Sequence, residues 1–403
     1  MTITDSAPIA FDPYDYVFQE DPYPIYARLR AEEPLHHNVQ HDFWVLSRYA
    51  DIQEALRTEG TYSNRMGVTI DRSAWNEGAH KVMSFLALDP PDHIRIRSLV
   101  ARAFTPRRVK ELAPRIQDLT EHYLEPALER GSFDWIKDFA GRLPMDVISE
   151  MMGVPESDRD EVRRLADLLV HREEGVDDVP ASGVEAAGKL FAYYADMLAQ
   201  RRRRPTEDLT SALLSAQIDD DRLHDDEIIA FLFLMVVAGN ETTTKLLGNA
   251  VFHLTRHPDQ HRAVFEEDFP VEPWIEETLR FDPSTQMLAR LLLQDVELHG
   301  RVAPAGSKAL VLLGSANRDE RVFGRPDEFD IHRDKDELAR LLSFGGGRHF
   351  CLGANLARLE ARIALRELVR RVGRIEVDHD SAVRVHSVNV RGFASLPMSV
   401  EGR

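Results

Sequence analysis

Apolar and polar residues recur at helical spacing through most of the chain, while short alternating runs lie near both ends. Alternation on either side of Gln40-His41-Asp42 predicts a β-hairpin. We expect strands at 35–39, 43–47, 286–290, 296–298, 308–313 and in short stretches of 374–400, and helices at 25–30, 50–56, 92–100, 273–280 and over most of 106–204. The pattern therefore predicts a mainly α fold with small β-sheets, of the α+β class.

Residues 228–239 are uncharged and apolar on every face. The run is too short to span a bilayer, which takes roughly 20 residues, and predicts a helix buried in a large core. Helical spacing then continues through Glu241 and Thr242, where a buried acid beside a hydroxyl is costly unless something uses it. Two interpretations stay open: a threonine bonded back to a carbonyl with the acid paired to a base, or a proton relay.

Two stretches lack regular periodicity and have the character of functional loops. We expect residues 62–85 to form a long loop with about one helical turn, and this loop could cover a substrate pocket. The acidic stretch 173–180, between helices, is where a mobile lid is expected.

Composition and charge narrow the classes of function. The chain has 403 residues and a formal net charge of −18, which argues against nucleic acid and against an anionic membrane surface. Length alone suggests two or three domains, and a single large core around a cofactor is the alternative. The N-terminus resembles neither a signal peptide nor an anchor, and there is one cysteine, so we expect a cytoplasmic protein.

That cysteine, Cys351, follows the glycines 345–347 and precedes a predicted helix. Free N–H groups and the dipole at a helix start favour thiolate over thiol. The glycines allow the chain to fold closely around a bulky planar group. An inert buried cysteine is the alternative; a zinc site lacks further ligands nearby, and a phosphate loop lacks its Lys-Ser/Thr. A thiolate ringed by amide donors suits the axial ligand of a haem iron.

The segment around this cysteine resembles the haem-binding signature of the cytochrome P-450 superfamily: Phe344-Gly345-x-Gly347-x-His349-x-Cys351-Leu352-Gly353. The segment 238–243 is similar to the oxygen-binding part of that family's central helix, and the two occur in the expected order. The resemblance implies a P-450 fold in one domain over 1–403, with about 1–10 as a flexible tail. It also implies haem b as cofactor and dioxygen as co-substrate.

The resemblance assigns expected roles to particular residues. Cys351 would ligate the iron, Thr242 and Glu241 would form the catalytic acid–alcohol pair, and Glu277 with Arg280 would form a buried structural ion pair. His93, Arg97, Arg290 and His349 would bind the haem propionates. The other expected cofactor contacts are Ala238, Phe344, Arg348 and Gly353, and the expected substrate contacts are Leu234, Val237, Gln286 and Met287.

The activity implied is that of a soluble bacterial monooxygenase acting on a lipophilic molecule of the steroid, terpenoid, fatty acid or polyketide class, such as one of secondary metabolism. Electrons would come from a ferredoxin and its NAD(P)H-dependent reductase, docked on a basic patch, and the protein would be a monomer. The patch comprises Arg107, Arg108, Lys110 and Arg348. The alternatives are a peroxygenase or isomerase, against which the Glu241-Thr242 pair argues, and a non-catalytic haem sensor.

Overall fold

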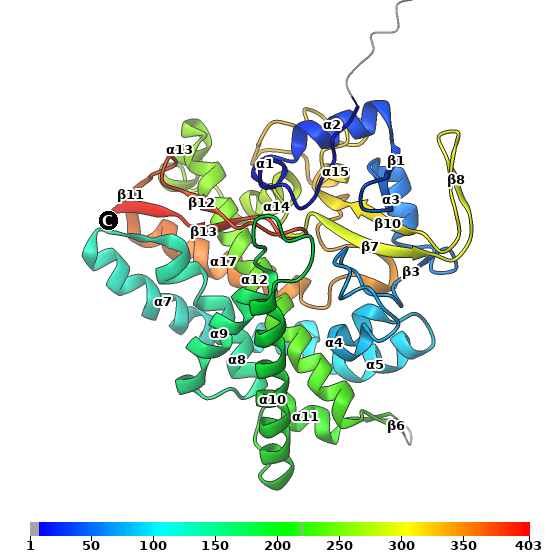
Figure 1. Ribbon diagram of the computed structural model, residues 1–403. Helices are drawn as coiled ribbons and strands as arrows, with labels where there is room; N and C mark the ends of the chain where they lie inside the picture. Colours follow the sequence, from blue (N-terminus) through cyan, green and yellow to red (C-terminus); the bar gives the residue numbers. More distant parts are fainter. Residues whose placement is uncertain (1–7, 219–220) are drawn as a thin grey trace, which may run out of the picture.

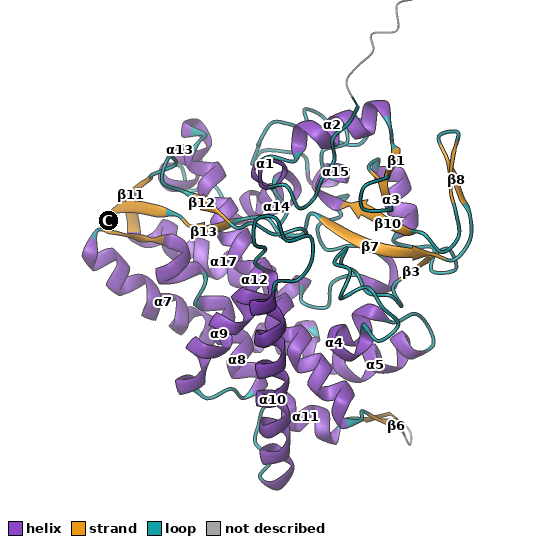
Figure 2. Ribbon diagram, in the orientation of Figure 1, coloured by secondary structure: helices purple, strands orange, loops and turns teal. Residues whose placement is uncertain are grey.

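Helices form most of the molecule, as the spacing of apolar residues predicts (Figures 1 and 2). The computed structural model describes residues 8–218 and 221–403. The α-helices are α1 (Tyr16–Glu20), α2 (Tyr23–Glu32), α3 (Tyr49–Ala55), α4 (His80–Met83), α5 (Asp92–Val100), α6 (Pro106–Glu111), α7 (Ala113–Arg130), α8 (Leu143–Met152), α9 (Glu156–Val170), α10 (Ala181–Arg203), α11 (Leu209–Ser215), α12 (Asp225–Thr255), α13 (Pro258–Glu266), α14 (Val271–Phe281), α15 (Leu313–Ala316), α16 (Lys335–Leu338) and α17 (Ala354–Arg371). Shorter 3₁₀ turns are η1 (Ser84–Ala87), η2 (Ala101–Phe104) and η4 (Gly347–His349), and η3 (Trp135–Ala140) is π-helical.

The strands are short and form small sheets, which confirms the predicted fold class. They are β1 (Leu35–Asn38), β2 (Phe43–Leu46), β3 (Tyr62–Ser63), β4 (Ser132–Asp134), β5 (Gln217–Ile218), β6 (Asp221–Arg222), β7 (Met287–Leu292), β8 (Val296–Leu298), β9 (Arg301–Ala303), β10 (Lys308–Leu312), β11 (Val372–Val377), β12 (Val383–Arg384), β13 (Phe393–Ser395) and β14 (Pro397–Gly402). The five-stranded sheet has the order β1-β2-β10-β7-β3, and the predicted hairpin β1–β2 is antiparallel.

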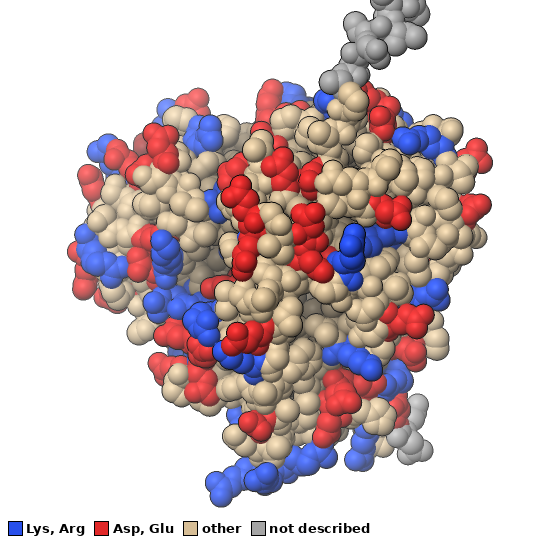
Figure 3. Space-filling model, in the orientation of Figure 1, with Lys and Arg blue, Asp and Glu red and all other residues tan. Residues whose placement is uncertain are grey.

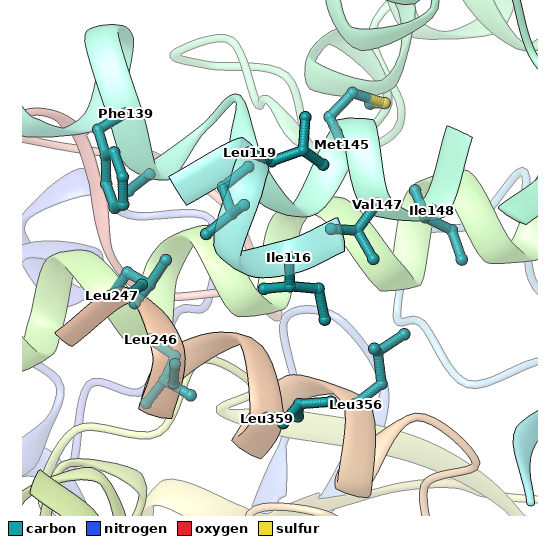
Figure 4. Packing of buried hydrophobic residues seen from close by; sticks show 14 of the residues in the cluster. Ile116, Leu119, Phe139, Met145, Val147, Ile148, Leu246, Leu247, Leu356 and Leu359 are labelled. Atoms are coloured by element: carbon teal, nitrogen blue, oxygen red, sulfur yellow. The ribbon is translucent and has the colours of Figure 1, made fainter. Parts of the chain in front are cut away.

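Two clusters of buried apolar side chains support these layers. The larger surrounds α12 and includes α7, α8 and α17, whose packed side chains are seen in Figure 4. The smaller joins the five-stranded sheet to α2, α3 and the N-terminal segment. The expected flexible tail lies outside the described residues at 1–7, whereas Ile9 and Phe11 are buried in this smaller cluster.

The apolar run 228–239 is one part of the much longer helix α12, which has 31 residues. Within the described residues α12 is long and apolar enough to cross a membrane by length and composition, so the expectation based on the shorter run was wrong about length. Of its most apolar stretch, 65% is buried inside the molecule. Its packing against α8, α9, α10, α14 and α17 makes it the central core helix.

The two irregular stretches take the form that the sequence predicts. Residues 62–85 contain β3, the single turn α4 and the start of η1, and are otherwise loop. Residues 171–180 connect α9 to α10 without regular structure. Asp71 in the first stretch and Arg172 in the second are buried against each other, so the two stretches are joined.

Candidate active site

One cavity collects most of the residues that the sequence marks as chemical. It holds about 1370 Å³ of space that protein atoms do not occupy, part of it open to solvent. Its walls come from α5, α8, α12, β7, α17 and nearby loops, and are mainly apolar with a few polar groups, as is typical of ligand sites. The predicted residues that line it are Arg97, Leu234, Ala238, Thr242, Arg290, Phe344, His349, Cys351 and Gly353.

Cys351 lies in a tight loop immediately before α17. Its N–H donates to the Phe344 carbonyl oxygen at 2.9 Å, and the chain reverses through Gly345 and Gly347, whose φ angles are +70° and +60°. These left-handed angles favour glycine. A Cβ on Gly347 would lie 2.3 Å from the Leu56 carbonyl oxygen, so no side chain fits there. The loop therefore holds the cysteine in one place at the cavity wall.

The environment of the Cys351 thiol contains opposing effects. The side chain is accessible from the cavity, yet it lies deep in the protein, and this burial raises the thiol pKa. Hydrogen bonds from the N–H groups of Gly353 and Ala354, and the charges of Arg97 and Arg358, act to lower it. The helix-start donors expected from the sequence are present, but burial is the larger effect. A metal cation deprotonates a coordinating thiol outright, so this site fits a thiolate ligand to a metal.

Basic side chains with unused hydrogen-bonding atoms gather at the same cavity. Arg290 is buried, which lowers its pKa to about 10, and among the described residues its guanidinium donates only to the Ala289 carbonyl (2.7 Å). The rings of His93 and His349 lie 4.1 Å apart. In the part of the chain that is described, both ring nitrogens of His93 and Nδ1 of His349 have no hydrogen-bond partner. Burial lowers the pKa of His93 to about 4, so the ring is neutral at pH 7.

Buried donors without an acceptor are rare in folded proteins and indicate a missing anionic or polar partner. Here they accompany a cysteine in a cavity of apolar walls, a set that matches the carboxylates, iron and flat apolar ring of a haem. Arg97 also lines the cavity, and it donates to the Phe350 carbonyl oxygen at 2.6 Å. The residues present therefore fit the expected cofactor.

The acid–alcohol pair on α12 is divided between the cavity and the core. Thr242 lines the cavity, and its hydroxyl donates to the Ala238 carbonyl oxygen at 2.7 Å. The Ser284 hydroxyl donates in turn to the Thr242 carbonyl at 2.7 Å. Glu241 is buried in the protein instead, with its Oε2 3.1 Å from Nζ of Lys245. Thr242 is thus bonded back to a carbonyl and also reaches the cavity, while Glu241 is paired to a base.

Three of the four expected substrate contacts do not line the cavity. Val237 packs against the helical core cluster. Gln286 donates to the Pro283 carbonyl at 2.8 Å, and Met287 is buried in the cluster around the sheet. The prediction took the residues next to Arg290 without their direction. Side chains of a strand alternate between its faces.

Leu288 lines the cavity in their place, two residues before Arg290 and on the same face of β7. Met235 on α12 and Thr285 before β7 also reach it. Strand alternation, applied outward from Arg290, would have found Leu288.

Two expected cofactor contacts lie elsewhere. Arg348 is on the surface, with its side chain 58% exposed and its Nε 2.9 Å from Glu59, because η4 turns it outward. His93 is not among the cavity-lining residues and lies behind His349.

Sequence reasoning missed one buried acid at the cavity wall. Glu360 on α17 is 2% exposed, and its Oε2 has no hydrogen-bond partner among the described residues. Burial raises its pKa well above the usual range. Glu360 follows the cavity-lining Leu356 by four residues, and that spacing on a helix gave the available signal.

The predicted pair of Glu277 and Arg280 is completely buried, with both side chains 0% exposed and a contact of 2.7 Å. Arg280 also donates to the carbonyl oxygens of Asn317, Pro326 and Glu328. The pair therefore ties α14 to the segment that leads into the cysteine loop.

Known proteins agree with this site and fold. The family model for cytochrome P450 matches residues 184–268 and 271–394. A putative cytochrome P450 123 of Mycobacterium tuberculosis is 53% identical over 404 residues, covering 100% of both chains. The vitamin D(3) 25-hydroxylase of Pseudonocardia autotrophica is 37% identical over 410 residues, again covering 100% of both. The solved structure of cytochrome P450 CYP109Q5 from Chondromyces apiculatus superimposes with a TM-score of 0.87 at 35% identity, covering 98% of this chain and 100% of the other.

The likeness extends over the whole chain and includes the segments that form the cysteine loop and the central helix. With relatives this similar at full length, the match is one of family and not of fold alone. The chain belongs to the cytochrome P450 family and is a monooxygenase that binds haem b and uses dioxygen.

Proposed function

We propose that this monooxygenase inserts one oxygen atom into a lipophilic small molecule, with Cys351 as the axial ligand of its haem and Thr242 and Glu241 as its proton-handling pair. The observation that carries the proposal is that Cys351 and Thr242, more than a hundred residues apart, line one apolar cavity. When bound, the haem supplies the activation of dioxygen, and a thiolate ligand favours cleavage of the O–O bond.

Residues of the cavity wall would hold the cofactor. Arg290, His349 and Arg97 would donate to the propionates, with His93 behind them, and Phe344 and Gly353 would contact the ring. The N–H groups of Gly353 and Ala354 would hydrogen-bond the sulfur, and such donors tune a thiolate ligand.

Thr242 and Glu241 would hold and move a proton at the cavity wall. The Thr242 hydroxyl, which donates to Ala238 at rest, would turn into the cavity to hold a proton there. Glu241 lies beside it on α12 and would supply that proton. Ala238 leaves room for oxygen because its side chain is small.

The cavity wall indicates the class of substrate. Apolar side chains dominate its inner surface, among them Phe85, Phe104, Ile148, Leu234 and Leu288. Such a wall favours a steroid, terpenoid, fatty acid or polyketide, and the named activity of the Pseudonocardia relative supports a molecule of the secosteroid kind.

We propose a ferredoxin, reduced by an NAD(P)H-dependent reductase, as the electron donor. Arg107, Arg108 and Lys110 are exposed on α6, which packs against α17, the helix that follows Cys351. A basic patch there would attract an acidic carrier toward the sulfur side of the cavity. The face in Figure 3 carries both kinds of charge, with basic side chains gathered at its lower end and acidic ones near its middle. We expect a cytoplasmic monomer.

The reduced protein treated with carbon monoxide tests the proposal. A strongly red-shifted Soret band is expected from the wild type and not from Cys351→Ser, in which the sulfur is missing. With ferredoxin, reductase and NAD(P)H, oxygen should be consumed, and Thr242→Ala should release more of it as hydrogen peroxide. A normal band in Cys351→Ser, or no oxygen consumption by the wild type, would overturn the proposal; the second result would favour a sensor.

A further inference from the structure

The N-terminal segment 9–20, which we call the strap, is anchored in the core and contacts both irregular stretches of the chain. Phe11 and Phe18 are buried in the smaller apolar cluster, with their ring centroids 5.0 Å apart. The buried Arg391 donates to the carbonyl oxygen of Gln19 at 2.6 Å. Apolar packing and hydrogen bonding therefore anchor the strap near both of its ends.

Tyr16 of the strap reaches the start of the loop 171–180. Its hydroxyl donates to the carbonyl oxygen of Arg172 at 2.7 Å, and its ring centroid lies 3.6 Å from that of His386. The carbonyl oxygen of His386 in turn accepts the N–H of Arg172 at 3.0 Å. Both backbone polar groups of Arg172 are thus bound, one by the strap and one by the C-terminal segment.

Tyr14 of the strap lies beside the buried ion pair that joins the two loops. Its hydroxyl is 3.5 Å from Oδ1 of Asp71, and the same oxygen accepts from Nε of Arg172 at 3.2 Å. Burial and the charge of Asp71 raise the pKa of Tyr14, so this hydroxyl keeps its proton at pH 7. The strap therefore contacts the loop 62–85 at Asp71 and the loop 171–180 at Arg172.

Both loops continue into parts of the molecule that enclose the cavity. The loop 62–85 ends at Phe85, which lines the cavity together with Leu86. The loop 171–180 joins α9 to α10, and both helices pack against α12. The cavity is partly open to solvent, so movement of these loops would change the access of a ligand to it.

We propose that the strap holds the two loops together and so determines how often they part to let a ligand reach the haem. The inference depends neither on the identity of the substrate nor on that of the electron donor. Opening must break the contacts of Tyr14 and Tyr16, because the strap is anchored in the core while the loops have to move.

Such a role has a kinetic signature that a role in ligand contact lacks. Among the described residues that line the cavity, none belongs to the strap. Loosening the strap would therefore leave the contacts of a bound ligand unchanged while opening becomes more frequent. Entry and exit should accelerate by the same factor, and the affinity should stay the same. A strap that only stabilises the fold would leave both rates unchanged.

The experiment measures the binding of 4-phenylimidazole to the ferric haem of the holoprotein, followed by stopped-flow absorbance at the Soret band. The test variant combines Tyr14→Phe with Tyr16→Phe, which removes two hydroxyls and keeps both rings. We expect its association and dissociation rate constants each to rise about fivefold, with Kd changed by less than about twofold. Amide hydrogen exchange in 171–180 should accelerate as well.

Tyr123→Phe is the matched control. The hydroxyl of Tyr123 donates to the carboxylate of Asp146 and so joins α7 to α8, away from both loops. Its loss should leave the two rate constants and the exchange of 171–180 as in the wild type.

Each variant is first shown to have the haem content of the wild type, so that binding rates refer to folded holoprotein. Unchanged rate constants in the double variant would overturn the inference, as would a change in Kd with only one rate constant altered. Equal acceleration in Tyr123→Phe would also overturn it, because the effect would not belong to the strap. The assay uses no electron donor, oxygen or substrate, so its outcome is separate from that of the proposed function.

Discussion

Two buried ion networks of the molecule differ in what they join. The first, which we call the scaffold network, comprises Glu277, Arg280 and Arg333, with Arg333 Nε 3.1 Å from Glu277. The second, which we call the latch, pairs Arg172 with Asp71 at 2.7 Å. Both are almost inaccessible to water, at 0–3% exposed for the scaffold and 1–6% for the latch.

The scaffold network joins the helix α14 to the segment 317–328. Arg280 and Arg333 donate to carbonyl oxygens within residues 317–328, so several hydrogen bonds hold this segment. The latch joins two loops, 62–85 and 171–180, and loops carry few other restraints. A second contact supports it, since Ser73 donates to Asp178 at 2.7 Å. Buried charges of similar exposure therefore stabilise the whole fold in the scaffold network and hold two loops together in the latch.

The largest effect is expected from Glu277→Gln. The change keeps the shape but leaves two buried arginines without their carboxylate, which costs about 3–5 kcal/mol of the free energy of unfolding. Urea unfolding of the holoprotein, together with its haem content, measures this. Glu272→Gln on the same helix is the control, because its pair with Arg366 is exposed and should contribute less than about 1 kcal/mol. Equal losses in both variants would contradict the scaffold interpretation.

A smaller and more local effect is expected from Arg172→Gln. Asp71 is then buried without its partner, but the two loops can open to water and relieve the cost without global unfolding. We expect amide hydrogen exchange in 62–85 and 171–180 to accelerate about tenfold, which corresponds to about 1.4 kcal/mol. Glu174→Gln changes charge at an exposed neighbour and serves as the control. Unfolding as severe as that of Glu277→Gln would remove the distinction between the networks.

The smallest effect is expected from Ser73→Ala, which removes one hydroxyl contact to Asp178 while the Ser73 N–H remains near the same carboxylate. A hydrogen bond of this kind contributes about 0.5–1.5 kcal/mol, and this one is exposed. Exchange in the two loops should rise two- to fivefold, below the change in Arg172→Gln. If Ser73→Ala were the stronger of the two, the buried pair would not be the main closure.

Much of the fold and the centre of the site could be predicted because their signals are local. The cysteine loop depends on glycines within six residues of Cys351, and α12 on an uninterrupted apolar run. The hairpin β1–β2 followed from alternation around one turn. In each case the residues that determine the structure are neighbours in the sequence.

The features that could not be predicted depend on the direction in which a side chain points or on contacts between residues far apart in the sequence. Met287 and Leu288 are neighbours in β7, but only Leu288 faces the cavity. Arg348 points outward from η4 and meets Glu59, which is far away in sequence. The latch likewise joins separate elements. No pattern along a single segment contains such information.

The contact between Gly347 and the carbonyl of Leu56 has a consequence for the order of assembly. Nearly three hundred residues separate the two, so the contact closes one of the longest loops in the chain, and contacts of this kind form late in folding. The N-terminal region must already be in place when the cysteine loop takes its shape. The cysteine loop can therefore take its final shape only after the C-terminal third has been synthesised.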